Sequence, residues 1–430
     1  MGLLKVDFIP KMEVSLSTYF FIIFTCCVCP VLALFSFELS AYTARTSQPK
    51  GCRKIGLRVK SNLADEYDEK YVEGGPAGKD ENGEDAWRIK SLWIYPIKSC
   101  TGVELNRGRM VGTGLEYDRQ FSFAQLRGPN AQDEDKKWRF ITQREFPTLA
   151  KVKPELWVPD PESRSYSPEK RDVLSEGVLV INYPVQLTGW SGSIATFAAR
   201  LQGTEPMRSF RVPFNPTPAQ IEENGYTKEK MTIWKESPEA LNMGNHIPRD
   251  FARSLGLKGP ITLFRVGRGN EREVFRSAPR KEELGRQPVT GFADAFPIHM
   301  QNLASVRDVA KRVEKDIPQF SAIRFRPNII IAGPPAYTED SWKRIRIGSH
   351  EFYVVCRTAR CRLPNIDPKT AVRHPIEPDK TLKSFRCIDE GAGTNACLGM
   401  EMVAKDEIFD IRAGEPVEVL ETGEHKYIPQ

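Results

Sequence analysis

A basic turn that carries a thiol is the most distinctive stretch of this sequence. Residues 354–368 read VVCRTARCRLPNIDP, so Cys361 stands between two arginines directly after an apolar, strand-like run. If the charges of Arg357, Arg360 and Arg362 come near this thiol, they favour the thiolate over the thiol. A thiolate can act as a nucleophile or as a soft ligand for a thiophilic metal, although an arbitrary cysteine is more often a small buried residue. Cys361 is therefore a candidate catalytic residue and a candidate metal ligand.

Short apolar runs separated by turn residues lie on both sides of this turn and predict a mainly β fold with some helices, of the α+β class. Two segments with helical apolar spacing, 248–257 and 299–313, predict helices. The charged stretches 205–239 and 267–291 predict loop insertions. The expected strands are Ile89–Pro96, Gln120–Ala124, Val178–Leu187, Asn328–Ala332, Lys343–Ile347, Phe352–Cys356 and Pro416–Leu420.

The length of 430 residues predicts two or more domains. The net charge is +6, from 62 basic and 56 acidic residues, and the basic excess is scattered along the chain. This pattern is typical of a solvated mixed surface and argues against a nucleic-acid partner.

The N-terminal part contains an uncharged apolar run, VSLSTYFFIIFTCCVCPVLALFSF, at residues 14–37. A helix of that length spans the hydrocarbon core of a bilayer, so the run predicts a transmembrane anchor after a flank at 1–13. A cleaved signal peptide is the alternative. The basic residues that follow predict a single-pass membrane protein whose large C-terminal part faces the cytosol. The acidic, Gly-rich composition within 38–86 predicts a flexible tether.

Basic and hydroxyl side chains recur where predicted strands begin or end. Lys98 and Ser99 follow one strand, Arg119 precedes another, and Arg326 and Asn328 flank the start of a third. Together they supply point-charge, fork-shaped and amide groups, which suit a phosphate and a polar heterocycle. Each of them alone is typical of an ordinary surface residue.

Five ordered blocks carry a family resemblance: YPIKSC (95–100), LEYDR (115–119), FADAFP (292–297), FRPNI (325–329) and RCRLP (360–364). With them the sequence resembles the MOSC family, in particular the branch that contains the mitochondrial amidoxime-reducing components. The resemblance covers residues 87–421. It implies an N-terminal MOSC β-barrel domain at 87–240, a MOSC β-barrel domain at 241–421 and a tail at 422–430.

The resemblance also implies a molybdenum cofactor, Mo-molybdopterin, whose metal is held by one protein cysteine. The matching cysteine is Cys361, in agreement with the soft-ligand interpretation. The residues that match the family's cofactor contacts, or lie in segments beside the cofactor, are Lys98, Ser99, Arg119, Asp294, Arg326, Asn328 and Arg360. The sequence departs from the animal members at Ala295 and Phe296, which replace small hydroxyl residues, at Thr358, which replaces a thiol, and near Met400 and Glu401, where an aromatic residue is replaced.

The function implied is reduction of N-hydroxylated compounds such as amidoximes and hydroxylamines. Because the sequence contains no nicotinamide or flavin motif, an external electron donor is needed, and the resemblance implies a b-type cytochrome and its NADH-dependent reductase. The family's anchored members imply the mitochondrial outer membrane. Two alternatives remain open: a sulfur-carrier or cofactor-maturation module with a persulfide on Cys361, and a non-catalytic binding protein that retains the fold.

Overall fold

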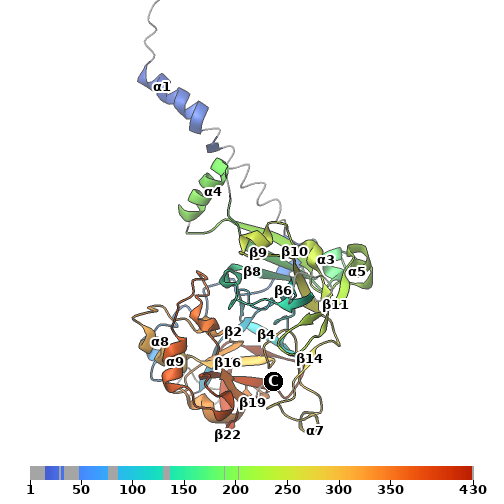
Figure 1. Cartoon of the computed structure of the whole chain (residues 1–430), viewed down its shortest axis with the longest axis vertical. Coiled ribbons are helices and arrows are strands. Elements are labelled where there is room, and N and C mark those ends of the chain that lie inside the picture. The colour runs from blue at the N-terminus through green and yellow to red at the C-terminus, as the bar shows by residue number, and fades with distance from the viewer. Residues whose placement is uncertain are drawn as a thin grey trace, which may run out of the picture. The chain divides into compact units, whose positions relative to one another are not determined.

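The computed structural model describes residues 15–28, 31–32, 48–75, 86–128, 136–187, 189–201 and 203–428. The chain divides into two compact units (Figure 1). The first unit comprises residues 1–48 and 185–208, and the second comprises 49–184 and 209–430. The second unit contains the β-sheets and every candidate site residue named above.

The first unit contains helix α1 (Leu16–Ile23), a π-helical turn at Phe24–Val28, and helix α4 (Gly189–Leu201). The prediction of a transmembrane anchor at 14–37, and with it of a single-pass membrane protein, is wrong for the described residues, because none of their helices is long and apolar enough to cross a bilayer. The regular helix α1 has 8 residues, whereas a span needs about 20. Within the described residues the α-helical turns change to wider π-helical turns at Phe24. Residues 14, 29–30 and 33–37 of the predicted anchor lie outside the described residues.

The second unit is built around a large β-barrel. Seven strands pair side by side in the order β17 (Ile329–Ala332), β16 (Ile298–Asn302), β20 (Cys397–Ala404), β19 (His350–Ala359), β18 (Trp342–Ile347), β22 (Pro416–Thr422) and β2 (Trp87–Ile94). Pairing of β2 with β17 closes the ring. Strand β3 (Val103–Leu105) extends the sheet beyond β2. Apolar side chains from almost every strand, among them Leu92, Met300, Ile345, Phe352 and Met402, fill the interior. Burial of these side chains is the main favourable term that holds the barrel together.

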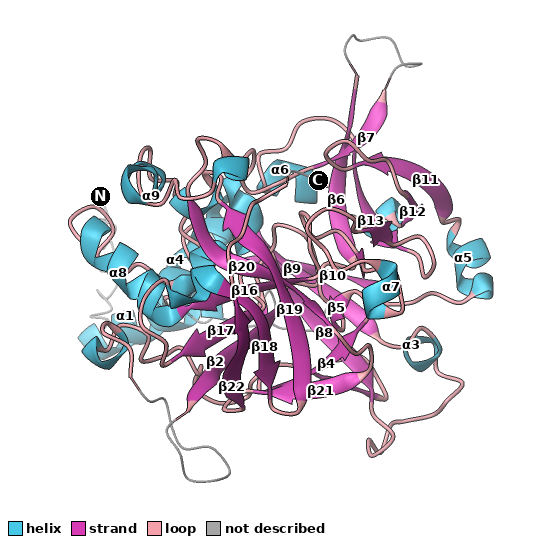
Figure 2. Cartoon of the chain, turned by 90° about the horizontal axis from the view of Figure 1, so that it is seen from below, coloured by secondary structure: helices cyan, strands magenta, loops and turns pink. Residues whose placement is uncertain are grey.

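A second, smaller closed barrel consists of β11 (Thr227–Thr232), β12 (Glu239–Asn242), β13 (Ile261–Val266), β6 (Phe121–Arg127) and β7 (Lys137–Phe140). Figure 2 shows this barrel beside the larger one. The chain alternates between them: β2 belongs to the larger barrel, β6, β7, β11, β12 and β13 build the smaller one, and β16 returns to the larger one. The remaining strands form small sheets: β1 (Cys52–Lys54) with β8 (Lys153–Pro159), β9 (Val178–Pro184) and β10 (Met207–Pro213); β21 (Phe409–Arg412) with β4 (Arg107–Val111) and β5 (Gly114–Leu115); and β14 (Arg272–Glu273) with β15 (Val289–Thr290).

Helix α8 (Leu303–Val313) and helix α9 (Asp379–Phe385) pack against the larger barrel on one side (Figure 2). The predicted helix 299–313 is too long, because residues 298–302 form the buried strand β16, which pairs with both β17 and β20. The helix begins at Leu303 after the cap Asn302. Of the predicted helix 248–257 only α6 (Phe251–Ser254) is regular; the other short helices are α3 (Arg171–Leu174), α5 (Pro218–Asn224) and α7 (Lys281–Leu284).

Two segments expected to be loops contribute regular structure. The stretch 205–239 contains β10, α5 and the barrel strand β11, in which Met231 is the buried side chain, so the charged composition reflects an exposed face. The stretch 267–291 contains β14, α7 and β15. Within the predicted tether 38–86, residues 48–75 supply β1 and pack on the second unit: Leu63 belongs to an apolar cluster with α8, and the buried Glu66 accepts a hydrogen bond from the Ala322 backbone N–H at 3.0 Å.

Candidate cofactor site

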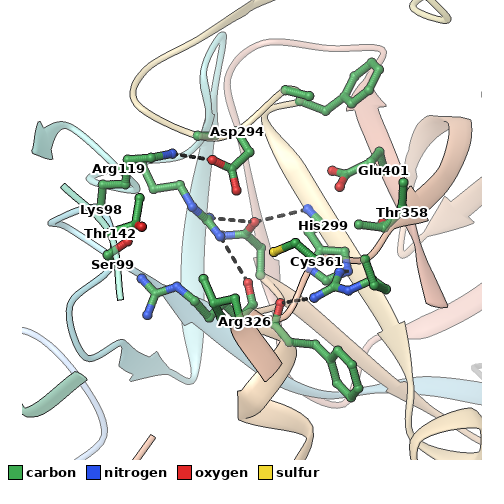
Figure 3. Close-up of a pocket in the computed structure, with 18 of the residues that line it drawn as sticks. Lys98, Ser99, Arg119, Thr142, Asp294, His299, Arg326, Thr358, Cys361 and Glu401 are labelled. Atoms are coloured by element: carbon green, nitrogen blue, oxygen red, sulfur yellow. Dashed lines mark hydrogen bonds and ion pairs between the residues drawn. The ribbon is translucent and has the colours of Figure 1, made fainter. Parts of the chain in front are cut away.

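One pocket brings together all eight residues proposed from the sequence. Its lining includes Lys98, Ser99, Arg119, Asp294, Arg326, Asn328, Arg360 and Cys361. These residues come from turns next to β2, β16, β17 and β19 of the larger barrel and next to β6 of the smaller barrel. Figure 3 shows Lys98, Arg119, Arg326, Asp294 and the Cys361 sulfur around one space.

Lys98 lies in the turn that follows β2. Its backbone N–H donates to the Phe121 carbonyl at 2.8 Å, and its ammonium donates to the Phe292 carbonyl at 2.8 Å and to the Asp294 carboxylate at 2.5 Å. Burial lowers the pKa of Lys98 to about 8 although Asp294 opposes this effect. Desolvation by itself would raise the pKa of Asp294, but Lys98 lowers it below its ordinary value. A buried ammonium is thus paired with a carboxylate whose side chain is 67% exposed at the pocket opening.

Arg119 and Asn328 form a fixed network behind the pocket. Arg119 pairs with the buried Asp118 and donates to the Asn328 side-chain oxygen at 3.1 Å and to the Arg326 carbonyl at 3.0 Å. The Asn328 oxygen also accepts from the His299 backbone N–H at 3.1 Å, and its amide nitrogen donates to the Trp93 carbonyl at 3.2 Å. Because both ends of the Asn328 amide are engaged by protein groups, this residue orients Arg119.

Arg326 is partly buried and has no carboxylate partner among the described residues. It has φ 55° at the end of the 3₁₀ helix Ala322–Phe325. Its guanidinium donates to the Cys100 carbonyl at 2.5 Å and lies 4.2 Å from the centre of the Tyr95 ring. Burial lowers its pKa to about 10, and one Nη atom is buried without a hydrogen bond to any described residue. This guanidinium can therefore bind an anion through its free N–H group.

Arg360, which also lines the pocket, likewise has a guanidinium nitrogen without a hydrogen-bond partner among the described residues. Its Nη atoms donate to the His299 ring nitrogen at 3.3 Å and to the Phe325 carbonyl at 3.1 Å, and its Nε is buried without a hydrogen-bond partner in the described chain. Burial lowers the pKa of Arg360, and it also lowers the pKa of His299 well below its ordinary value. His299 is therefore neutral and can accept the hydrogen bond from Arg360.

Cys361 lies at the turn after β19 and its thiol is free and exposed. The three arginines near it in sequence differ in position. Arg357 pairs with Asp389 at 3.2 Å and Arg362 pairs with Asp379 at 3.1 Å, so each has its own carboxylate. Of these three arginines, Arg360 is the one that lines the same pocket as Cys361.

The pocket also contains residues that the sequence argument did not assign to the site: Thr142, Arg144, His299, Thr358, Glu401 and Tyr427. His299 was placed in a helix, although the run IHMQN at 298–302 carries the signal of a buried strand with polar residues at alternating positions. Thr358 and Glu401 had been noted as departures from the animal proteins. Burial raises the pKa of Glu401 to about 7, although the positive charge of the nearby Arg360 acts to lower it.

These side chains fit an anionic cofactor that carries a soft metal. Lys98 and Arg119 are matched by Asp294 and Asp118, whereas Arg326 and Arg360 have no carboxylate within ion-pair distance in the described part of the chain. A buried cation without a counter-ion is costly, so the pocket is suited to a ligand that brings negative charge. A phosphate can accept hydrogen bonds from the free guanidinium N–H groups, and a thiolate at Cys361 can hold a thiophilic metal.

Comparisons with known proteins identify the family. A model of the MOSC domain matches residues 287–418, and a model of the MOSC N-terminal beta barrel domain matches 86–166. Mitochondrial amidoxime reducing component 2 of Rattus norvegicus is 34% identical over 333 residues, which cover 76% of this chain and 82% of the relative. For mitochondrial amidoxime-reducing component 1 of Xenopus laevis the identity is 32%, and the aligned residues cover 79% and 84% of the two chains.

A second kind of relative is the molybdenum cofactor sulfurase of Arabidopsis thaliana. It is 24% identical over 76% of this chain, but the alignment covers 35% of that longer protein. The domain matches and the relatives that align over most of both chains agree with the two-barrel architecture described above. The chain belongs to the MOSC family.

Proposed function

We propose that this protein is a molybdenum-cofactor oxidoreductase that reduces N-hydroxylated compounds such as amidoximes and hydroxylamines. MOSC proteins are associated with the molybdenum cofactor, as are the proteins that this chain resembles. The observation that carries the proposal is an exposed thiol, Cys361, in one pocket with two partly buried guanidiniums, those of Arg326 and Arg360, which have no carboxylate partner among the described residues.

Each group has a defined task in this proposal. The Cys361 thiolate holds the metal, and Lys98, Ser99, Arg119, Arg326 and Arg360 bind the anionic part of the cofactor. Asp294 keeps Lys98 charged within the buried wall. Asn328 and His299 keep Arg119 and Arg360 in place through the hydrogen bonds described above. The bound cofactor supplies two-electron redox chemistry, and the protein supplies orientation and electrostatics.

The reaction balances with an external donor. An amidoxime R–C(NH₂)=N–OH takes up two electrons and two protons, its N–O bond breaks, and the products are the amidine R–C(NH₂)=NH and water. We propose that the electrons come from NADH through a reductase and a b-type cytochrome, because the sequence has no nicotinamide or flavin motif of its own. The protons come from solvent that reaches the pocket or from an acidic side chain.

The test compares the molybdenum content of the full chain with that of Cys361→Ser and Cys361→Ala. Wild type is expected to carry about one molybdenum per chain, and both variants to lose it, because a hydroxyl or methyl group cannot replace a thiolate as a soft ligand. Reduction of benzamidoxime with NADH, a b-type cytochrome and its reductase then tests the activity. Full retention of molybdenum in both variants contradicts the ligand role of Cys361.

A second candidate is a sulfur-carrier or cofactor-maturation module with a Cys361 persulfide. It is supported by similarity to proteins named molybdenum cofactor sulfurase. The alignments cover 35% and 31% of those proteins, whereas they cover more than 80% of several amidoxime-reducing relatives. Mass spectrometry of the purified chain distinguishes the two: this candidate requires a dithiothreitol-sensitive gain of one sulfur atom on Cys361.

A further inference from the structure

Glu401 is a pocket-lining carboxyl for which the residues described so far provide no role. It lies on β20, where it pairs in register with Cys356 of β19 and His299 of β16. The site contains a second lining carboxyl, Asp294, which is paired with Lys98. Glu401 has no ion-pair partner among the described residues, and Figure 3 shows it beside Thr358, away from Lys98 and Ser99.

The pocket therefore has two chemically different walls. One wall carries Lys98, Arg119 and Arg326 and suits a phosphate. The other carries Glu401 and Thr358, with Ala295, Phe296 and Tyr427 nearby in the lining. The Thr358 hydroxyl is buried and makes no well-aligned hydrogen bond to a described residue, although it lies close enough to lower the pKa of Glu401. A carboxyl and a hydroxyl without strong partners can serve a ligand that presents N–H groups.

We infer that Glu401 selects the substrate: its carboxylate binds the N–H groups of an amidine- or guanidine-type N-hydroxylated compound, with Thr358 as a second hydrogen-bonding group. This inference rests on the proposed function, which it makes more specific. An amidoxime presents the N–H bonds of its NH₂ group to such a carboxylate, and the amidine product presents one N–H from each nitrogen in a fork that matches the two carboxylate oxygens, the geometry by which arginine recognises carboxylates. The same wall disfavours small anions such as nitrite, because like charges repel in a site of low dielectric constant.

The surroundings of Glu401 keep this carboxyl available to a ligand. Burial raises its pKa to about 7, so at neutral pH it is close to half ionised, and a cationic or N–H-donating ligand stabilises the ionised form. Arg360 and Arg119 also favour the ionised carboxylate and lower its pKa, whereas the negative charge of Asp294 raises it. The titratable and charged groups around it are Arg119, Asp294, His299, Cys356, Arg360, Cys397 and Tyr427.

The experiment uses the full, cofactor-loaded chain and compares wild type with Glu401→Gln, Glu401→Asp and the control Glu418→Gln. Glu418 is an exposed carboxylate on β22 that pairs with Arg346 and lies outside the pocket. Glu401→Gln is expected to raise the KM for benzamidoxime and the Kd for benzamidine about ten- to a hundredfold, the range for a lost charged hydrogen bond. The kcat should change less than threefold, Glu401→Asp should be intermediate, and Glu418→Gln should match wild type.

Calorimetry of benzamidine binding adds a readout that needs no turnover. Because the carboxyl is partly protonated at pH 7 and binds the amidinium in its ionised form, wild type is expected to release close to half a proton per benzamidine, and Glu401→Gln none. Molybdenum content and melting temperature show whether each variant is loaded and folded. If Glu401→Gln does not fold, Glu401→Asp and Thr358→Val still test the same wall.

Two results would overturn the inference: benzamidine affinity within twofold of wild type in Glu401→Gln, or a fall in kcat with unchanged KM. The proposed function fails separately, if the wild-type chain holds no molybdenum or does not reduce benzamidoxime. In that case the calorimetric comparison still shows whether Glu401 binds an amidine.

Discussion

Substitution of Arg326 by methionine should have opposite effects on the empty and the loaded protein. The pKa of this partly buried guanidinium is lowered to about 10, which at about 1.4 kcal/mol per tenfold change corresponds to a cost on the order of 3 kcal/mol for keeping it charged. Methionine fills similar space without charge, but it leaves the Cys100 carbonyl without its 2.5 Å hydrogen bond, a loss of about 1–2 kcal/mol. We therefore expect the cofactor-free variant to be more stable than wild type by about 1–2 kcal/mol.

In the loaded protein the same substitution removes a charged hydrogen bond to the cofactor. Such a bond contributes about 1.5–3 kcal/mol, so cofactor retention should weaken by about one to two orders of magnitude. The assay is thermal unfolding of cofactor-free samples, combined with molybdenum content after dialysis of loaded samples. The control is Arg324→Met: Arg324 is also buried, but it pairs with Asp367 at 2.7 Å. Loss of that pair should destabilise the protein by about 3 kcal/mol whether it is empty or loaded. A cofactor-free Arg326→Met that melts below wild type, or one that keeps the cofactor as well as wild type, would refute the reasoning.

Three further predictions concern the same fold. The pKa of Glu401 is raised to about 7 in the folded chain, so the folded state holds a proton that the unfolded state loses near pH 4.5, and the free energy of unfolding falls as the pH rises between these values. In denaturant unfolding of cofactor-free protein, Glu401→Gln should lose less of this free energy from pH 5 to 8 than wild type, by on the order of 3 kcal/mol. The same pH dependence in both proteins would contradict this. Gly399→Ala should unfold at a lower denaturant concentration than wild type, because φ is +80° and a Cβ would lie 2.7 Å from the Met300 carbonyl oxygen; a neutral effect would show that the strand relaxes. Leu63→Ala should cost about 2–5 kcal/mol in the same assay if residues 48–75 are an integral part of the second unit, and a loss below about 1 kcal/mol would show that they are not.

The sequence predicted the strands around Cys361 well, because 350–359 alternates between buried and less buried residues and 329–332 is a continuous apolar run. Segments 329–332, 342–347 and 350–359 are strands close to the expected positions. The helix expected at 299–313 was wrong at its start, since the alternation of apolar and polar residues at 298–302 is short and runs directly into the helical spacing that follows. Strand β11 was missed because its exposed charged face hides a single buried methionine.

At the site, the residue types were predictable but their partners were not. Ordered blocks placed Lys98, Arg326 and Cys361 in one family pattern, and the structure brings them to one pocket. Which arginine faces the thiol depends on the carboxylates at Asp379 and Asp389, which pair with Arg362 and Arg357. Contacts of this kind arise only in three dimensions, so spacing along the chain cannot reveal that Arg326 and Arg360 are the cations without counter-ions.

The interlocked order of the strands determines when the site can exist during synthesis. Strand β2, which leads into Lys98, is made early, but its barrel partners β17 and β22 and the pocket strand β20 emerge near the end of translation. Until β17 emerges, the edge of β2 opposite β3 has no partner, and until β20 emerges Glu401 is not yet part of the nascent chain. The pocket is therefore assembled after nearly the whole polypeptide has left the ribosome, and a ligand that needs all its walls can enter only as a late, post-translational step.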